Sequence, residues 1–108
     1  MTVSEIAHSL GLEILVKGKD DRKVTGGYSG DLLSWVMGRA REGDAWITIM
    51  GNINAIAVAV LADISCIILA EGSPLDQDAK ERAESERIPV LGSQKTAYNL
   101  SIELERII

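Results

Sequence analysis

The sequence predicts an α/β fold, a single three-layer α/β/α domain with a mainly parallel central sheet. The first observation is the stretch of residues 45–70, whose only charged residue is Asp63. Strands this apolar belong in the middle of a parallel sheet that is covered on both faces. The second observation is that strand and helix patterns alternate along the chain, as in βαβ units with right-handed crossovers. A length of 108 residues suits one domain, so we assign residues 1–108 to it.

The chain opens with a short helix and a strand. Thr2 followed three residues later by Glu5 is a capping-box pattern, which predicts a helix that begins after Thr2. Gly11 ends this helix, because glycine readily adopts the left-handed backbone of a helix C-terminus. Residues 12–16 form the first strand, and the charged segment 17–22 forms a solvated turn.

A second strand and a second helix follow. Residues 23–25 are expected to form a short strand that ends at Gly26 and Gly27. Apolar residues at three- and four-residue spacing predict the helix, and Gly43 stops it. These apolar positions are Leu32, Leu33, Val36, Met37 and Ala40.

The central stretch predicts a strand, a glycine turn, an apolar helix and another strand. Their expected bounds are residues 46–50, 51–54, 55–62 and 64–70. The helix is apolar on all sides, whereas an outer helix of a small domain normally carries a polar face. We expect neighbouring helices and a second copy of the chain to cover it. Complete burial by the adjacent terminal helices is the alternative.

Two helices and a strand complete the chain. Ser73 as N-cap, with Pro74 at the first helical position, predicts a charged outer helix that ends at Arg87. Residues 88–91 form a short strand, in which Pro89 indicates either a first residue or an edge position. The last helix has one apolar face, made by Ala97, Leu100, Leu104 and Ile107.

Composition excludes several classes of function. The chain has 11 Lys and Arg against 16 Asp and Glu, a net charge of −5, so we expect no nucleic-acid partner. Polar residues interrupt the apolar stretch before about 18 apolar residues accumulate, so we expect no membrane span. One cysteine, Cys66, and one histidine, His8, offer neither a disulfide nor a metal cluster, and we expect no cofactor. The N-terminus lacks a secretory pattern, and we expect a cytoplasmic protein.

Candidate binding residues follow from the rule that ligands bind beyond the carboxyl ends of strands in an open parallel sheet. The residues expected there are Gly26, Gly27, Tyr28, Gly51, Asn52, Asn54, Glu71, Gly72, Gly92 and Ser93. Glycines, amides and a hydroxyl suit a small polar ligand. The structural alternative is that Asn52 or Asn54 caps the apolar helix, that Gly72 and Gly92 end strands and that Glu71 is solvated. The set contains no nucleophile with a base, so no catalytic residue is predicted.

Several motifs, taken in order, resemble the stand-alone members of the DRTGG domain family. They are Val24-Thr25-Gly26-Gly27-Tyr28, Asp31-Leu32-Leu33-Ser34-x-Val36-Met37, Gly43-Asp44-x-Trp46-x-Thr48, Asn54-x-x-Ala57-Val58-Ala59 and Ile88-Pro89-Val90-Leu91. The resemblance implies an α/β/α domain similar to the N-terminal domain of HPr kinase/phosphorylase and to a module of some phosphotransacetylases and CBS-domain pyrophosphatases. In those proteins it is an accessory, regulatory or dimer-forming unit. The family is named for a signature, an Asp-Arg pair after the glycine that ends one strand and a Thr-Gly-Gly that ends the next. This chain departs from it at both places, which hold Gly51-Asn52-Ile53 and Ala70-Glu71-Gly72.

Two functions remain open at this point. The first is a non-catalytic regulatory or protein-interaction module that acts as a homodimer or with a partner protein. The second is a small-ligand sensor that binds a nucleotide or phosphorylated metabolite at the carboxyl edge of the sheet. We do not expect an enzyme, and a kinase in particular is not supported because the chain lacks the P-loop pattern.

Overall fold

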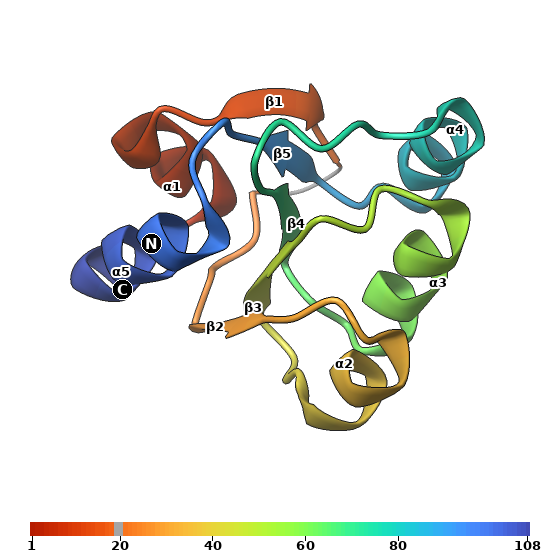
Figure 1. Ribbon diagram of the computed structural model, residues 1–108, viewed down its shortest axis with the longest axis horizontal. Coiled ribbons are helices and arrows are strands. Elements are labelled where there is room, and N and C mark those ends of the chain that lie inside the picture. The colour runs from red at the N-terminus through yellow and green to blue at the C-terminus, as the bar shows by residue number, and fades with distance from the viewer. Residues whose placement is uncertain (19–20) are drawn as a thin grey trace.

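The computed structural model describes residues 1–18 and 21–108, and part of the predicted turn, residues 19–20, lies outside them. The elements are α1 (Val3–Leu10), β1 (Glu13–Val16), β2 (Gly26–Ser29), α2 (Leu33–Arg39), β3 (Asp44–Thr48), α3 (Ile53–Leu61), β4 (Cys66–Leu69), α4 (Gln77–Glu86), β5 (Val90–Gly92) and α5 (Ala97–Ile107). Helices α1 and α5 cover one face of the sheet, and α2, α3 and α4 cover the other (Figure 1). The predicted three-layer α/β/α domain is confirmed.

The sheet has the strand order β1-β5-β4-β3-β2. Neighbouring strands from β2 to β5 run parallel, and β1 runs antiparallel to its neighbour β5. Every residue of β3 and β4 is buried, as predicted for the strands of the apolar stretch 45–70, and Asp44, which precedes that stretch, is buried with them. Pro89 directly precedes β5, which lies inside the sheet, and its carbonyl accepts a hydrogen bond from Ile67 N at 3.0 Å. The edge position considered for Pro89 is therefore wrong.

Helix α1 forms as its sequence predicts. The Thr2 side chain accepts a hydrogen bond from Glu5 N, and the Glu5 carboxylate accepts one from Thr2 N at 2.9 Å. Gly11 ends the helix with φ of 65°, in the left-handed region that favours glycine. The capping box and the glycine stop are both confirmed.

The second strand lies later in the chain than the sequence predicts. Residues 23–25 are not a strand, and Lys23 forms only an isolated bridge with Thr2. Gly26 and Gly27 lie inside β2 instead of after it. A Cβ at Gly26 would lie 2.8 Å from Asp44 Oδ1, and one at Gly27 would lie 2.9 Å from Leu104 Cδ2. A side chain at either position would therefore require the Asp44 or Leu104 side chain to move.

The start of α4 also differs from the prediction. Its N-cap is Asp76, and Ser73 and Pro74 belong to the preceding loop. This loop crosses to the turn before α3, where a Cβ at Gly51 would overlap the Pro74 carbonyl oxygen and lie 3.0 Å from the carbonyl carbon. Asp76 N donates a hydrogen bond to Gly51 O at 2.9 Å. Tertiary packing against Gly51 therefore delays the helix that Ser73 and Pro74 would otherwise begin.

Helix α3 lies between α2 and α4 (Figure 1), so the alternative that the terminal helices bury it is wrong. Its inner side is fully buried through Ala55, Ile56 and Ala59. On the outer side, Ile53 is 36% exposed and Leu61 is 72% exposed. The neighbouring helices therefore cover α3 only in part.

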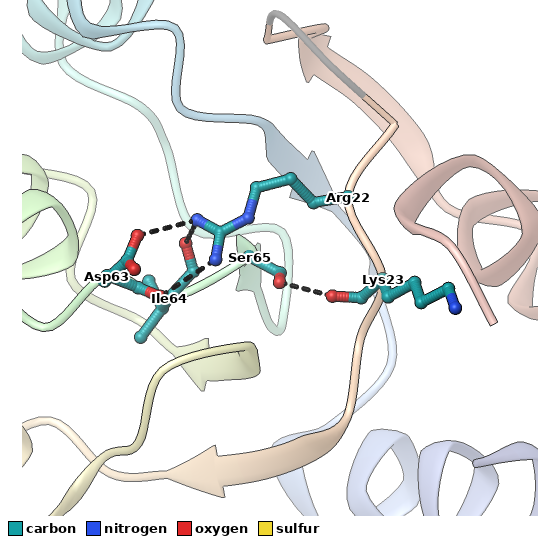
Figure 2. Close-up of polar contacts among 5 residues, drawn as sticks. All are labelled: Arg22, Lys23, Asp63, Ile64 and Ser65. Atoms are coloured by element: carbon teal, nitrogen blue, oxygen red, sulfur yellow. Dashed lines mark hydrogen bonds and ion pairs between the residues drawn. The ribbon is translucent and has the colours of Figure 1, made fainter.

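The connection between β1 and β2 is fixed at the amino ends of the parallel strands. Arg22 Nη1 donates to Asp63 Oδ1 at 2.9 Å and to the carbonyl of Ile64 at 3.1 Å, while Nη2 donates to the carbonyl of Asp63 at 3.3 Å (Figure 2). Ser65, which is fully buried, donates its hydroxyl to the carbonyl of Lys23 at 2.6 Å. These contacts hold the connection against the residues that lead into β4.

Candidate functional site

The carboxyl ends of β2, β3, β4 and β5 meet at one edge of the sheet, as the parallel pairing requires. The amino end of β1 joins them, because β1 is antiparallel and Glu13 pairs with Gly92. The turn that ends α1 at Gly11 therefore lies at the same edge. We call this part of the molecule the carboxyl edge.

The residues of the first signature segment, 51–53, stabilise the start of α3 and its contact with the loop before α4. Asn52 is the N-cap of α3, and its Oδ1 accepts a hydrogen bond from Ala55 N at 2.9 Å. Asn54 lies exposed in the first turn of the helix and does not cap it. Gly51 is the position where the loop before α4 makes its closest approach. The structural alternative considered for Asn52 is thus confirmed.

The second signature segment, residues 70–72, connects the ends of two strands. Glu71 and Gly72 both have left-handed backbones, with φ of 57° and 66°. Glu71 N donates to the carbonyl of Lys95 at 2.9 Å, and Gly72 N donates to the carbonyl of Ser93 at 2.8 Å. The turn after β4 and the loop after β5 therefore form one hydrogen-bonded unit at the carboxyl edge.

The structure does not bring the earlier glycines to this edge. Gly26 pairs with Asp44, the first residue of β3, and so lies toward the amino ends of the strands. Gly27 follows it inside β2, and Tyr28 packs half-buried against the core beneath α2 and α3. The expectation that Gly26 and Gly27 join the site at the carboxyl edge is wrong, because β2 begins at Gly26.

A cleft of about 680 Å³ opens at the carboxyl edge between β1, α4 and the loops that follow β4 and β5. Of the predicted residues, Gly72, Gly92 and Ser93 line it. The other lining residues with polar side chains are Glu13, Ser73, Gln77, Lys80, Gln94 and Lys95. Sequence reasoning missed all six, including both lysines.

Lys95 is held at the edge of this cleft by three contacts. Its Nζ lies 2.8 Å from Glu103 Oε1, which is on α5, and 3.5 Å from the carbonyl of Leu10. Its backbone N–H donates to Ser93 Oγ at 3.1 Å. The ammonium group thus lies where the cleft meets the layer of α1 and α5.

Asp31 is a further residue at the carboxyl edge that the prediction did not place there. Its Oδ1 accepts hydrogen bonds from Thr48 Oγ1 at 2.7 Å and from Ile49 N at 2.9 Å. The N-cap of α2 is Leu32, which makes no side-chain cap. Asp31 therefore fixes the loop after β2 to the end of β3.

The groups at the carboxyl edge are suited to binding. Amides, hydroxyls, lysines and backbone N–H groups can form hydrogen bonds and ion pairs with a polar ligand. The thiol of Cys66 lies inside β4, where burial raises its pKa to about 12, so it is not available as a nucleophile. Within residues 1–18 and 21–108, no three His, Cys, Asp or Glu side chains are grouped so that they could hold a metal ion.

Comparison with known proteins assigns the domain to a family. A sequence model of the DRTGG domain matches residues 5–107, and the chain belongs to the DRTGG domain family. The resemblance seen in the sequence motifs is thereby confirmed. No curated protein matches the sequence. Among the described residues, no helix has the length and apolar character needed to cross a membrane.

A solved structure has the same fold. It contains the CBS and DRTGG domains of the regulatory region of a Clostridium perfringens pyrophosphatase, complexed with its activator, diadenosine tetraphosphate. The TM-score is 0.78 at 15% sequence identity, and the match covers 95% of this chain and 45% of the other. The chain thus spans less than half the length of that relative.

Proposed function

We propose that this chain is a non-catalytic regulatory module that acts as a cytoplasmic homodimer through the outer face of α3. The observation that carries the proposal is an apolar stripe on this face. It consists of Ile53, Ala57, Val60 and Leu61, at the spacing of one helix side. All four are half-buried or exposed, and Val60, at the margin of the face, also packs against the core. We call these four residues the α3 stripe.

A second copy of the chain is the occupant that best fits this stripe. Helix α3 carries no charged residue, whereas α4 beside it is mostly charged. In a two-fold interface the same surface of the two protomers is in contact, so a charged helix there would face the like charges of the second copy. An uncharged helix avoids this repulsion, and the small side chain of Ala57 allows two helices to approach closely.

Sedimentation velocity at high micromolar concentration tests the proposal. We expect the wild-type chain to sediment as a dimer and Leu61→Glu to sediment as a monomer, because the substitution adds a like charge on each side of the interface. Tyr98→Glu is the matched control, since Tyr98 is 76% exposed on α5 in the opposite layer. A monomeric wild type, or a dimer that Tyr98→Glu dissociates and Leu61→Glu does not, contradicts the proposal.

A small-ligand sensor is the second candidate, and the cleft at the carboxyl edge favours it. Its volume of about 680 Å³ lies in the range of small-molecule sites. The activator complex of the structurally similar pyrophosphatase region supports a search among nucleotides. A ligand that binds the folded chain alone raises its melting temperature by mass action. A panel of nucleotides and phosphorylated metabolites that leaves the melting temperature unchanged contradicts this candidate.

A further inference from the structure

We infer that the cleft at the carboxyl edge binds a phosphorylated small molecule whose anionic group is held by Lys80 and Lys95. This inference rests on the second candidate function and assigns its site and its ligand class. It moves the expected site from Gly26, which lies toward the amino ends of the strands, and from Asn52, which caps α3, to the cleft at the carboxyl edge. Three observations support the inference: the polar lining of the cleft, its charge and the position of Lys95.

The charge of the cleft is opposite to the charge of the chain. The chain has a net charge of −5, whereas the charged residues that line the cleft, among residues 1–18 and 21–108, are two lysines, Lys80 and Lys95, and one carboxylate, Glu13. In an acidic protein, a local excess of positive charge within a concave surface attracts an anion. Phosphate esters are the common small-molecule anions that lysine holds through charge-assisted hydrogen bonds.

The remaining walls suit the uncharged part of such a ligand. Gln77 and Gln94 offer amide donors and acceptors, and Ser73 and Ser93 offer hydroxyls. The Glu13 carboxylate can accept hydrogen bonds from hydroxyl or amino groups of the ligand. A molecule with one phosphorylated end and a hydroxyl-bearing end matches this lining better than an apolar compound does.

Lys95 already makes an ion pair that a ligand anion would have to replace or share. Its partner Glu103 lies on α5 outside the cleft lining, with Nζ and Oε1 2.8 Å apart. Glu103 therefore competes with the ligand for the same ammonium group. Removing the charge of Glu103 should strengthen anion binding, which a purely structural role of this pair would not do.

Titrations of the ¹⁵N-labelled full chain test the inference, with inorganic phosphate, pyrophosphate and ATP as probes and adenosine as the uncharged control. We expect ATP to shift the backbone amide signals of Gly72, Ser93 and Lys95, and adenosine to leave them unchanged or shift them far less. Three variants test the ion pairs. Lys80→Gln and Lys95→Gln should each weaken ATP binding about tenfold. Glu103→Gln should strengthen ATP binding severalfold. Arg106→Gln, which removes an exposed positive charge from the last turn of α5, is the matched control and should leave the affinity nearly unchanged.

The titration results distinguish failure of the lysine cleft from failure of the ligand sensor and of the homodimer. If no phosphate-bearing probe shifts the cleft amides, or if the lysine variants bind as the wild type does, the inference is wrong. Shifts confined to residues 51–54 would leave a ligand sensor in place and refute the lysine cleft. Because the titration reports binding in monomer and dimer alike, it is independent of the oligomeric state. A monomer that binds ATP in the cleft refutes the homodimer alone.

Discussion

The guanidinium group of Arg22 and the carboxylate of Asp63 form an ion pair at 2.9 Å across 41 residues of sequence (Figure 2). Asp63 has a left-handed backbone with φ of 54°, and its carbonyl and that of Ile64 both accept hydrogen bonds from the same guanidinium. Arg22 thus closes the turn between α3 and β4 and fixes the crossover into β2. Its contacts with the two carbonyls do not depend on the charge of Asp63.

Substitution of Arg22 should therefore destabilise the fold more than substitution of Asp63. Arg22→Ala removes three hydrogen bonds and should cost about 2 kcal/mol in the free energy of unfolding. Asp63→Asn keeps a residue that tolerates the left-handed backbone and should cost less than about 1 kcal/mol, because the pair is half exposed. Urea unfolding followed by the fluorescence of buried Trp46 measures both. Equal losses would show that the ion pair, not the carbonyl contacts, dominates.

Two glycines should respond in opposite ways to alanine. A Cβ at Gly51 would overlap the Pro74 carbonyl oxygen, so Gly51→Ala should force the loop before α4 away and destabilise the fold by about 1–3 kcal/mol. Gly38 lies inside α2, where an added Cβ would meet no atom within 4 Å, so Gly38→Ala should stabilise the fold by up to about 1 kcal/mol. Thermal unfolding of the two variants compares them directly. A Gly51→Ala chain as stable as the wild type would contradict the close approach.

The attachment of α1 should weaken in acid. Asp21 accepts hydrogen bonds from the hydroxyl and the backbone N–H of Ser4, and these bonds hold the pKa of Asp21 below its ordinary value. Because the folded pKa is lowered, this stabilisation is present above the unfolded pKa of about 3.9 and is lost as the pH falls through the folded pKa. The stability difference between the wild type and Asp21→Asn should therefore shrink between about pH 5 and about pH 2. A difference that stays constant over this range would contradict the assignment.

The thiol of Cys66 should react only when the chain unfolds. Cys66 is fully buried in β4, and burial raises its pKa to about 12, so the folded protein presents neither access nor thiolate. Labelling with a chromogenic disulfide should be slow in native buffer and should accelerate with urea in parallel with unfolding. Rapid labelling in native buffer would indicate that β4 is accessible in the folded state.

The central elements could be predicted from sequence because local and global signals agree there. Strands β3 and β4 come from an apolar segment rich in β-branched residues. Their local preference for a strand and their buried positions in the sheet therefore favour the same structure. The position of β2 could not be predicted, since two glycines disfavour a strand locally and the sequence therefore favours a strand before them, at residues 23–25. The side chains of Asp44 and Leu104 pack against the backbone at these glycines, a tertiary contact that no local pattern in the sequence shows.

The candidate site was predicted only in part, for a related reason. The carboxyl edge follows from parallel pairing, and Gly72, Gly92 and Ser93 do lie at the cleft there. Lys80 lies in α4, whose many charged residues predict a helix that faces solvent. No pattern in the sequence predicts that Lys80 lies beside a cleft. The antiparallel pairing of β1, which brings Glu13 to the same edge, also depends on topology and not on a local pattern.

The central claim, a homodimer through the α3 stripe, is tested most directly by isotope-filtered nuclear Overhauser spectroscopy on a mixture of labelled and unlabelled chains. We expect intermolecular contacts among the methyl groups of Ile53, Ala57, Val60 and Leu61. We expect none from Tyr98 or Ile102 of α5, which are exposed on the opposite layer. Intermolecular contacts confined to α5, or no intermolecular contacts at concentrations where the chain should be dimeric, would contradict the claim.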